Sequence, residues 1–166
     1  MKAKLLIALM YSNKDIYNNA ISLLIKRFGE IDRESLEYKF NFTNYYEKEM
    51  GSNLLKRFVT FKELIDAEEL KKIKLFTHKI EEKFSMNNKR LINIDPGYIT
   101  KTQLVLASFK EKPRKIYLGK GVYADLILLF KKDGCITFKW TFPDYKLKEN
   151  QEFFLEVRKN ILTKNL

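Results

Sequence analysis

"KLLIALMY", residues 4–11, gives the strongest strand signal in the chain. It is short and almost wholly apolar, which predicts a strand covered on both faces near the centre of a sheet. The run is too short to cross a membrane, and the polar "SNKD" that follows is not typical of a signal-peptide cleavage region. We therefore expect a soluble, cytoplasmic protein with no membrane partner.

Helical periodicity follows this strand and returns twice along the chain. Ser12 with Asp15 forms a capping pair by sequence, and a helix is predicted from there to Gly29. A second helix is predicted from near Asp66, with Glu69 completing a capping pair, and a third over about residues 149–162. The second helix is expected to bury Leu70, Ile73, Thr77, Ile80 and Phe84.

Strand patterns occupy most of the remaining chain. "YKFNF" (38–42) alternates apolar and polar residues, "LINID" (91–95) ends at an acid, and residues 115–140 contain three β segments, the last two joined at Asp133-Gly134. "TQLVLASF" (102–109) fits either a strand or two helical turns. No repeat or linker divides the chain. We predict a single α+β domain over residues 1–166, a two-layer sandwich with two or three helices on one mixed, largely antiparallel sheet.

Charge points toward a phosphate-bearing partner. The chain has 166 residues and a net charge of +11, and residues 84–166 hold 16 basic against 8 acidic residues. Such an excess attracts phosphorylated molecules, including nucleic acid. Most of the basic residues are lysine, however, and arginine is better suited to forked phosphate contacts.

Cysteine and histidine chemistry is excluded by composition. With one cysteine and one histidine, the chain forms no internal disulfide and no cysteine/histidine zinc site. His78 lies away from the apolar stripe of its helix, so we expect a solvated surface residue. Cys135 follows a hairpin turn and has no partner that would activate it. Carboxylate, tyrosine, lysine and arginine chemistry remains.

"NIDPGYIT" (93–100) marks the first candidate site. Proline followed by glycine predicts a type II turn over Asp95-Pro96-Gly97-Tyr98, with Asp95 still in the preceding strand. If that strand is parallel to its neighbour, Asp95 stands where ligands bind in open sheets. In the alternative interpretation, Asp95 only caps the turn.

Three further segments collect polar and aromatic side chains. They are "FNFTNYYEKEMG" (40–51), "RKIYLGKGVYAD" (114–125) and "WTFPDY" (140–145). Each also has a purely structural interpretation: a short helix capped by Thr43 and closed by Gly51, a tight hairpin or bulge, and a turn that leads into the last helix.

These four segments, with "LVLAS" (104–108), occur in an order that resembles the domain of unknown function 4416 family over nearly the whole chain. No activity is assigned to that family. Some members carry an automatic label of GTP-binding protein, which the resemblance passes on only as a suggestion of a nucleotide ligand. The chain has no G-x-x-x-x-G-K-[ST] loop, and Gly119-Lys120-Gly121 does not replace one.

Convergence of the four segments at one sheet edge would form a site. Asp95, Asp125 and Glu49 are the candidate catalytic residues; the oxygens of Asp95 and Asp125 would suit Mg²⁺. A carboxylate crowded by aromatic rings would instead have a raised pKa and act as a general acid or base. The candidate ligand-binding residues are Thr43, Tyr45, Tyr46, Tyr98, Arg57, Arg114, Lys120, Tyr123, Asp144 and Tyr145.

Three functions are compatible with this pattern. The leading hypothesis is an anionic small molecule, a nucleotide or another phosphorylated ligand, bound with or without catalysis. The second is an RNA- or DNA-binding module, and the third is a protein-interaction domain whose motifs serve only the fold. The nucleic-acid hypothesis would use Phe109, Lys110, Lys112, Arg114, Lys115, Tyr117, Lys120 and Tyr123.

Overall fold

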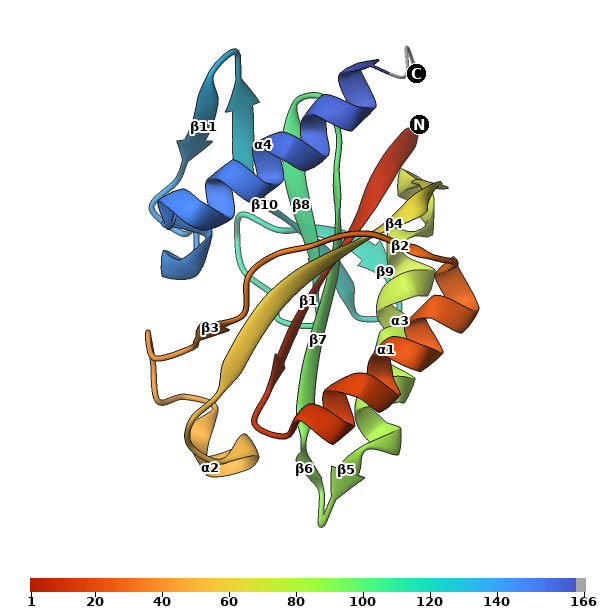
Figure 1. The fold of residues 1–166 in the computed structure, drawn as a ribbon, viewed down its shortest axis with the longest axis vertical. Helices are drawn as coiled ribbons and strands as arrows, with labels where there is room; N and C mark the ends of the chain where they lie inside the picture. Colours follow the sequence, from red (N-terminus) through yellow and green to blue (C-terminus); the bar gives the residue numbers. More distant parts are fainter. Residues whose placement is uncertain (164–166) are drawn as a thin grey trace.

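The computed structural model describes residues 1–163, and within them a nine-stranded antiparallel sheet forms the centre of the molecule (Figure 1). The strands lie in the order β11-β10-β8-β7-β1-β4-β2, with β3 also paired to β4 and β9 to β10. The predicted central strand is confirmed, because β1 lies between β7 and β4. The strands are β1 (Lys2–Tyr11), β2 (Ile31–Glu34), β3 (Tyr38–Lys39), β4 (Leu55–Asp66), β7 (Ile92–Ile99), β8 (Gln103–Ser108), β9 (Ile116–Gly119), β10 (Val122–Lys131) and β11 (Gly134–Thr137). A separate hairpin joins β5 (Ser85–Met86) to β6 (Lys89–Arg90).

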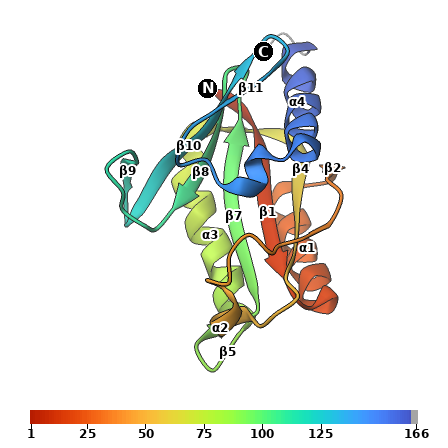
Figure 2. The same cartoon turned by 90° about the vertical axis from the view of Figure 1, so that its left-hand side faces the viewer.

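Helices cover both faces of the sheet, at different ends of it (Figures 1 and 2). Helices α1 (Lys14–Phe28) and α3 (Leu70–Lys83) pack on the face that carries Leu5 and Ile7. Helix α4 (Lys148–Thr163) packs on the face that carries Leu6 and Ala8. The α+β class and the antiparallel pairing are confirmed, and α4 adds a layer on the second face. The short helices are η1 (Ala67–Glu69), α2 (Glu47–Met50) and η2 (Pro143–Lys146).

Most predicted helix ends are confirmed, with one change at the start of α1. The capping box of Asp66 and Glu69 is present before α3, and Gly29 ends α1. The N-cap of α1 is Asn13 and not Ser12, because the Asn13 Oδ1 accepts hydrogen bonds from the backbone N–H of Asp15 at 2.8 Å and of Ile16 at 3.3 Å. The hydroxyl of Ser12 instead donates to the carbonyl oxygen of Met50.

Two strands differ from the sequence prediction. "YKFNF" is extended only over Tyr38–Lys39, and the ambiguous segment 102–109 contains strand β8. The long strand β4, which pairs with the full length of β1, was not predicted. Its charged residues, among them Lys56 and Arg57, hide the alternation that puts Phe58 on one face and Val59 and Phe61 on the other.

The predicted turn at Pro96-Gly97 is wrong, because β7 runs straight through it. Pro96 pairs with Ile7 and Gly97 with Leu6, and β7 is antiparallel to both of its neighbours. Pairing with β8 begins only at Gly97, so Pro96 stands outside that ladder, where a missing N–H is tolerated. Gly97 has no positive φ; a Cβ there would overlap the carbonyl oxygen of Val105. The glycine therefore allows close approach of two strands and does not make a turn.

Among residues 1–163, no helix combines the length and the apolar composition needed to cross a membrane.

Candidate functional site

The candidate site lies on the half of the α4 face that α4 leaves uncovered. Lys56 and Asn93 both pair with Met10, and Asp95 pairs with Ala8. Asp125 pairs with Leu106, whose own partner on β7 is Gly97. Since alternate residues of a strand share a face, Lys56, Asp95 and Asp125 all project from one face of the sheet. Strand register therefore brings together polar residues from β4, β7 and β10.

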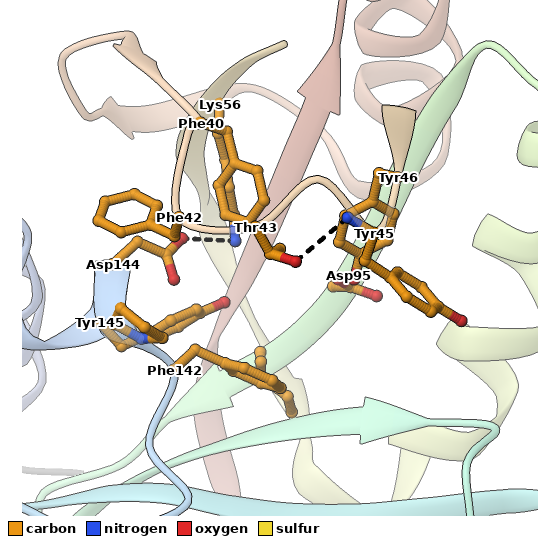
Figure 3. Close-up of a pocket in the computed structure, with 12 residues that line it drawn as sticks. Phe40, Phe42, Thr43, Tyr45, Tyr46, Lys56, Asp95, Phe142, Asp144 and Tyr145 are labelled. Carbon is orange, nitrogen blue, oxygen red and sulfur yellow. Dashed lines mark hydrogen bonds and ion pairs between the residues drawn. The ribbon is translucent and has the colours of Figure 1, made fainter. Parts of the chain in front are cut away.

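Two adjoining cavities cover these side chains. The first, the aromatic cavity, has a volume of about 350 Å³ (Figure 3). The second, the basic cavity, has a volume of about 420 Å³. Both volumes are typical of small-molecule sites. Tyr46, Asp95, Leu106 and Phe142 line both cavities. The aromatic cavity is named for Phe40, Phe42, Tyr45, Tyr46, Phe142 and Tyr145, and the basic cavity for Lys74, Arg90, Lys110, Lys112, Arg114 and Lys115.

Helix α3 reaches the site around an open edge of β7. Before Gly97 no β8 residue pairs with β7, so the backbone of Ile94 needs other partners. Its N–H donates to the Glu81 Oε2 at 2.8 Å, and its carbonyl oxygen accepts from the Lys74 Nζ at 3.5 Å. Lys74 and Glu81, the two buried charged residues of α3, therefore supply the hydrogen bonds that a neighbouring strand would otherwise make to Ile94. They also introduce an ammonium group beside Asp95.

Asp95 is an ionised carboxylate at the junction of the two cavities. Its Oδ1 accepts from Lys74 at 3.2 Å and its Oδ2 from Asn93 at 2.8 Å, while 31% of the side chain stays exposed. Burial favours the neutral form, but the charges of Lys74 and Lys56 outweigh it and hold the pKa of Asp95 below its ordinary value. The expected raised pKa is therefore not found at Asp95. It is found at Glu81, where burial raises the pKa.

Glu49, a predicted catalytic residue, holds a wall of the basic cavity. Both of its carboxylate oxygens accept from the Arg90 guanidinium, at 2.8–3.1 Å. The same guanidinium donates to the Asn93 Oδ1 at 2.7 Å and to the Glu81 Oε2 at 3.2 Å. The hydrogen bonds that Arg90 donates to Glu49 lower the pKa of Glu49. Glu49 does not line either cavity, and its contacts give it a positioning role.

The lowered pKa of Glu49 predicts a pH-dependent stability difference. Glu49→Gln is expected to lower the free energy of unfolding by about 1 kcal/mol at neutral pH, because a partly exposed forked ion pair is lost. The folded pKa lies below the unfolded one, so this contribution is complete above the ordinary glutamate pKa and disappears as the pH falls through the folded value. Urea unfolding of both proteins at about pH 7 and about pH 3 measures the difference. Glu47→Gln, on the same helix, is the control, and an equal loss at both pH values would contradict the assignment.

Asp125 is buried beneath the basic cavity. Its two oxygens accept from Arg114 Nε and Nη2, each at 3.2 Å, and the Lys115 Nζ lies 3.4 Å away. Burial lowers the pKa of Lys115 and outweighs the opposing effect of Asp125, and the neighbouring charges of Arg114 and Lys110 lower the pKa further. Two cations thus share one carboxylate.

In the part of the chain that the structure describes, the predicted magnesium ligands, Asp95 and Asp125, do not belong to a larger cluster of metal-binding side chains. Within residues 1–163 no three Asp, Glu, His or Cys side chains group in a way that could hold a metal ion. Asp95 bonds to Lys74 and Asn93, and Asp125 to Arg114 and Lys115, so each carboxylate already has two protein donors.

Asp144 anchors the far side of the aromatic cavity. Its buried Oδ2 lies 2.7 Å from the Lys56 Nζ and accepts a hydrogen bond of 2.7 Å from the Tyr38 hydroxyl. The Lys56 ammonium also lies 5.1 Å from the ring centres of both Phe40 and Tyr145. Figure 3 shows this ion pair across the cavity from Asp95. The pair links β4 to η2 and fixes one wall.

Most of the predicted site residues meet at these cavities, and others do not. Thr43, Tyr45, Tyr46, Asp95, Asp144 and Tyr145 line the aromatic cavity, and Arg114 and Asp125 line the basic one. Tyr98 and Arg57 lie on the opposite face of the sheet, because they pair with Leu5 and Leu9. Lys120 is exposed in a tight β9–β10 hairpin, where Gly119, Lys120 and Gly121 all have positive φ. Tyr123 packs on Tyr117.

Several lining residues were not predicted for a small-molecule site. Lys56, Lys74 and Arg90 are the clearest. Only Lys56 had a signal in the sequence, because its neighbours at strand spacing, Leu54 and Phe58, are apolar. The proposed nucleic-acid set divides between two places. Phe109, Lys110, Lys112, Arg114 and Lys115 line the basic cavity, whereas Tyr117, Lys120 and Tyr123 belong to the β9–β10 hairpin or its strands.

The fold and cavities define an α+β protein with a basic and an aromatic compartment on one open sheet face. The chain belongs to the family described as Domain of unknown function (DUF4416), which matches residues 1–161 and confirms the resemblance drawn from the four motifs. No curated protein and no solved structure matches the chain.

Proposed function

We propose that this protein binds a phosphate-bearing small molecule in the basic cavity. The observation that carries the proposal is an unbalanced lining, in which six basic side chains face two acidic ones, Asp95 and Asp125. Lys110 and Lys112 have no ion pair with any carboxylate in residues 1–163. A cavity with excess positive charge favours a multiply charged anion.

The buried cations of the cavity are already positioned. Lys115 has 5% of its side chain exposed, and its Nζ donates to the Ser108 Oγ at 2.8 Å and to the Lys110 carbonyl oxygen at 3.1 Å. Burial and the adjacent Arg114 and Lys110 charges disfavour its protonated form, so a bound anion would relieve this repulsion. Little ordering of the Lys115 side chain therefore remains to be done on binding.

A small ligand fits this arrangement better than a nucleic-acid strand. The cations of the basic cavity line a hollow of about 420 Å³, a volume typical of small-molecule sites. Of the three predicted catalytic carboxylates, only Asp95 faces both cavities; if turnover accompanies binding, its ionised side chain is the proposed base. We keep the cytoplasm as the proposed location, since a phosphorylated metabolite would be available there.

Isothermal titration calorimetry with pyrophosphate tests the proposal. We expect saturable binding to the wild type, and at least about a tenfold weaker affinity for the double variant Lys110→Ala/Lys112→Ala, because each loses a charge-assisted contact. The control is Lys120→Ala/Lys132→Ala, which removes the same charge at exposed positions outside the basic cavity. Equal losses in the two double variants would indicate general electrostatic attraction and would contradict a site in the basic cavity.

A short RNA in the same titration separates the alternative function. Binding to RNA that falls steeply with salt, without any saturable binding of pyrophosphate, would favour the nucleic-acid hypothesis.

A further inference from the structure

We propose that the two cavities together bind one ribonucleoside phosphate. The planar ring lies in the aromatic cavity, the phosphates lie in the basic cavity, and the ribose hydroxyls contact Asp95 between them. The inference rests on the proposed function and adds the class of ligand. A nucleotide places its ring, sugar and phosphates in that order along its length. The aromatic cavity, Asp95 and the basic cavity follow one another in the same order.

The aromatic cavity provides stacking surfaces from two separate segments. Figure 3 shows Phe40 and Phe42 on one side of the cavity and Phe142 with Tyr145 on the other. Tyr45 is 63% exposed and Phe142 43% exposed, so both rings have free surface that a planar ligand would cover. Stacking on aromatic side chains tolerates any nucleobase, because each has a π face.

Asp95 stands where the sugar would lie. It lines both cavities, and each of its oxygens has one protein donor, which leaves lone pairs free to accept hydrogen bonds from hydroxyl groups. Tyr46, the second polar residue shared by the two cavities, is also suited to a hydroxyl-bearing sugar. Burial and the Asp95 charge raise its pKa to about 12, so its phenol stays protonated and can donate.

Lys110 connects the two compartments at their mouth. Its Nζ lies 3.1 Å from the Tyr45 hydroxyl and 4.4 Å from the centre of the Tyr45 ring. Tyr45 lines the aromatic cavity, and Lys110 lines the basic cavity. A ligand with a ring at one end and phosphate at the other would therefore contact both members of the pair, which neither a free phosphate nor an uncharged nucleoside does.

The test compares four probes on the wild-type protein by calorimetry, without added divalent cation: tripolyphosphate, the ribonucleoside triphosphates, their 2′,3′-dideoxy counterparts and the unphosphorylated nucleosides. We expect at least one ribonucleoside triphosphate to bind at least about tenfold tighter than tripolyphosphate. Its dideoxy counterpart is expected to bind about fivefold to tenfold more weakly, because the hydroxyl contacts to Asp95 are lost. The nucleosides alone should bind most weakly.

Two variants test whether the aromatic cavity recognises the ring and whether Asp95 recognises the ribose hydroxyls. Phe42→Ala removes a ring that lines only the aromatic cavity, so it is expected to weaken nucleotide binding about tenfold and to leave tripolyphosphate binding unchanged. Tyr117→Ala, an exposed ring outside both cavities, is the matched control and should change neither. Asp95→Asn is expected to abolish the preference for the ribonucleotide over the dideoxynucleotide. The comparison of probes on the wild type keeps the inference testable even if Asp95→Asn unfolds.

The outcomes separate the inference from the proposed function. If tripolyphosphate binds as tightly as every nucleotide, or the dideoxynucleotides bind as tightly as the ribonucleotides, the inference is overturned while phosphate binding stands. If no phosphorylated probe binds, both fail.

Discussion

Lys56→Met is expected to lower the free energy of unfolding by about 3–5 kcal/mol, because it leaves Asp144 charged and buried without its counterion. Methionine retains the length of the lysine stem, so little packing is lost. The Tyr38 hydroxyl still donates to Asp144, but one neutral hydrogen bond does not replace an ammonium at 2.7 Å. Equilibrium unfolding in urea, with the slope checked for constancy, measures the change.

Lys62→Met is the matched control on the same strand. Lys62 pairs with Glu30, and both side chains are largely exposed, so their ion pair is screened by water and its removal should have a much smaller effect. Equal losses for the two variants would show that the Lys56–Asp144 pair does not hold β4 to η2.

Gly97→Ala is expected to destabilise the protein by about 3 kcal/mol, because the added methyl group has no room. The new Cβ would overlap the carbonyl oxygen of Val105 and lie 2.6 Å from the Leu106 Cδ2 and 3.2 Å from the Leu106 Cα. Two of these three atoms belong to the backbone of β8, which cannot rotate away. Thermal and urea unfolding of the variant check the expected loss.

Gly51→Ala distinguishes this steric cost from the cost of backbone conformation. Gly51 has a φ of 85° but no atom within 4 Å of the position of a new Cβ, so only the left-handed conformation opposes the substitution. A loss of about 1 kcal/mol is expected there. If Gly97→Ala were as mild as Gly51→Ala, β7 would not pass through Pro96-Gly97 as a paired strand.

Elements with a strong periodic signal could be predicted from the sequence, and elements defined by tertiary pairing could not. The apolar strand β1 and the helices α1, α3 and α4 bury their faces in the ordinary way. At Pro96-Gly97 the local rule for a turn was outweighed, because the glycine is needed for the close approach of β8, a contact that depends on strand pairing. Strand β4 was missed because its charged residues interrupt the apolar alternation, and the partner that allows Lys56 to be buried, Asp144, is far away in the sequence.

The candidate site was predicted in its motifs but not in its geometry. Segments 40–51, 114–125 and 140–145 do meet above Asp95, as their polar and aromatic composition suggested. Tyr98 was included because it lies close to Asp95 in the sequence. Successive side chains of a strand point to opposite faces, so two residues that are three positions apart lie on different faces of the sheet. Lys74 and Arg90 come from elements that the motifs do not contain, and only the fold brings them to Asp95 and Asn93.

The most direct test of phosphate binding in the basic cavity is an NMR titration of the lysine side chains with and without saturating pyrophosphate. Lys115 has a pKa lowered by burial and by the Arg114 and Lys110 charges. An anion bound in the cavity should raise that pKa, so binding should be accompanied by proton uptake at pH values between the free and the bound Lys115 pKa. A Lys115 pKa that is the same with and without saturating pyrophosphate would contradict the site in the basic cavity.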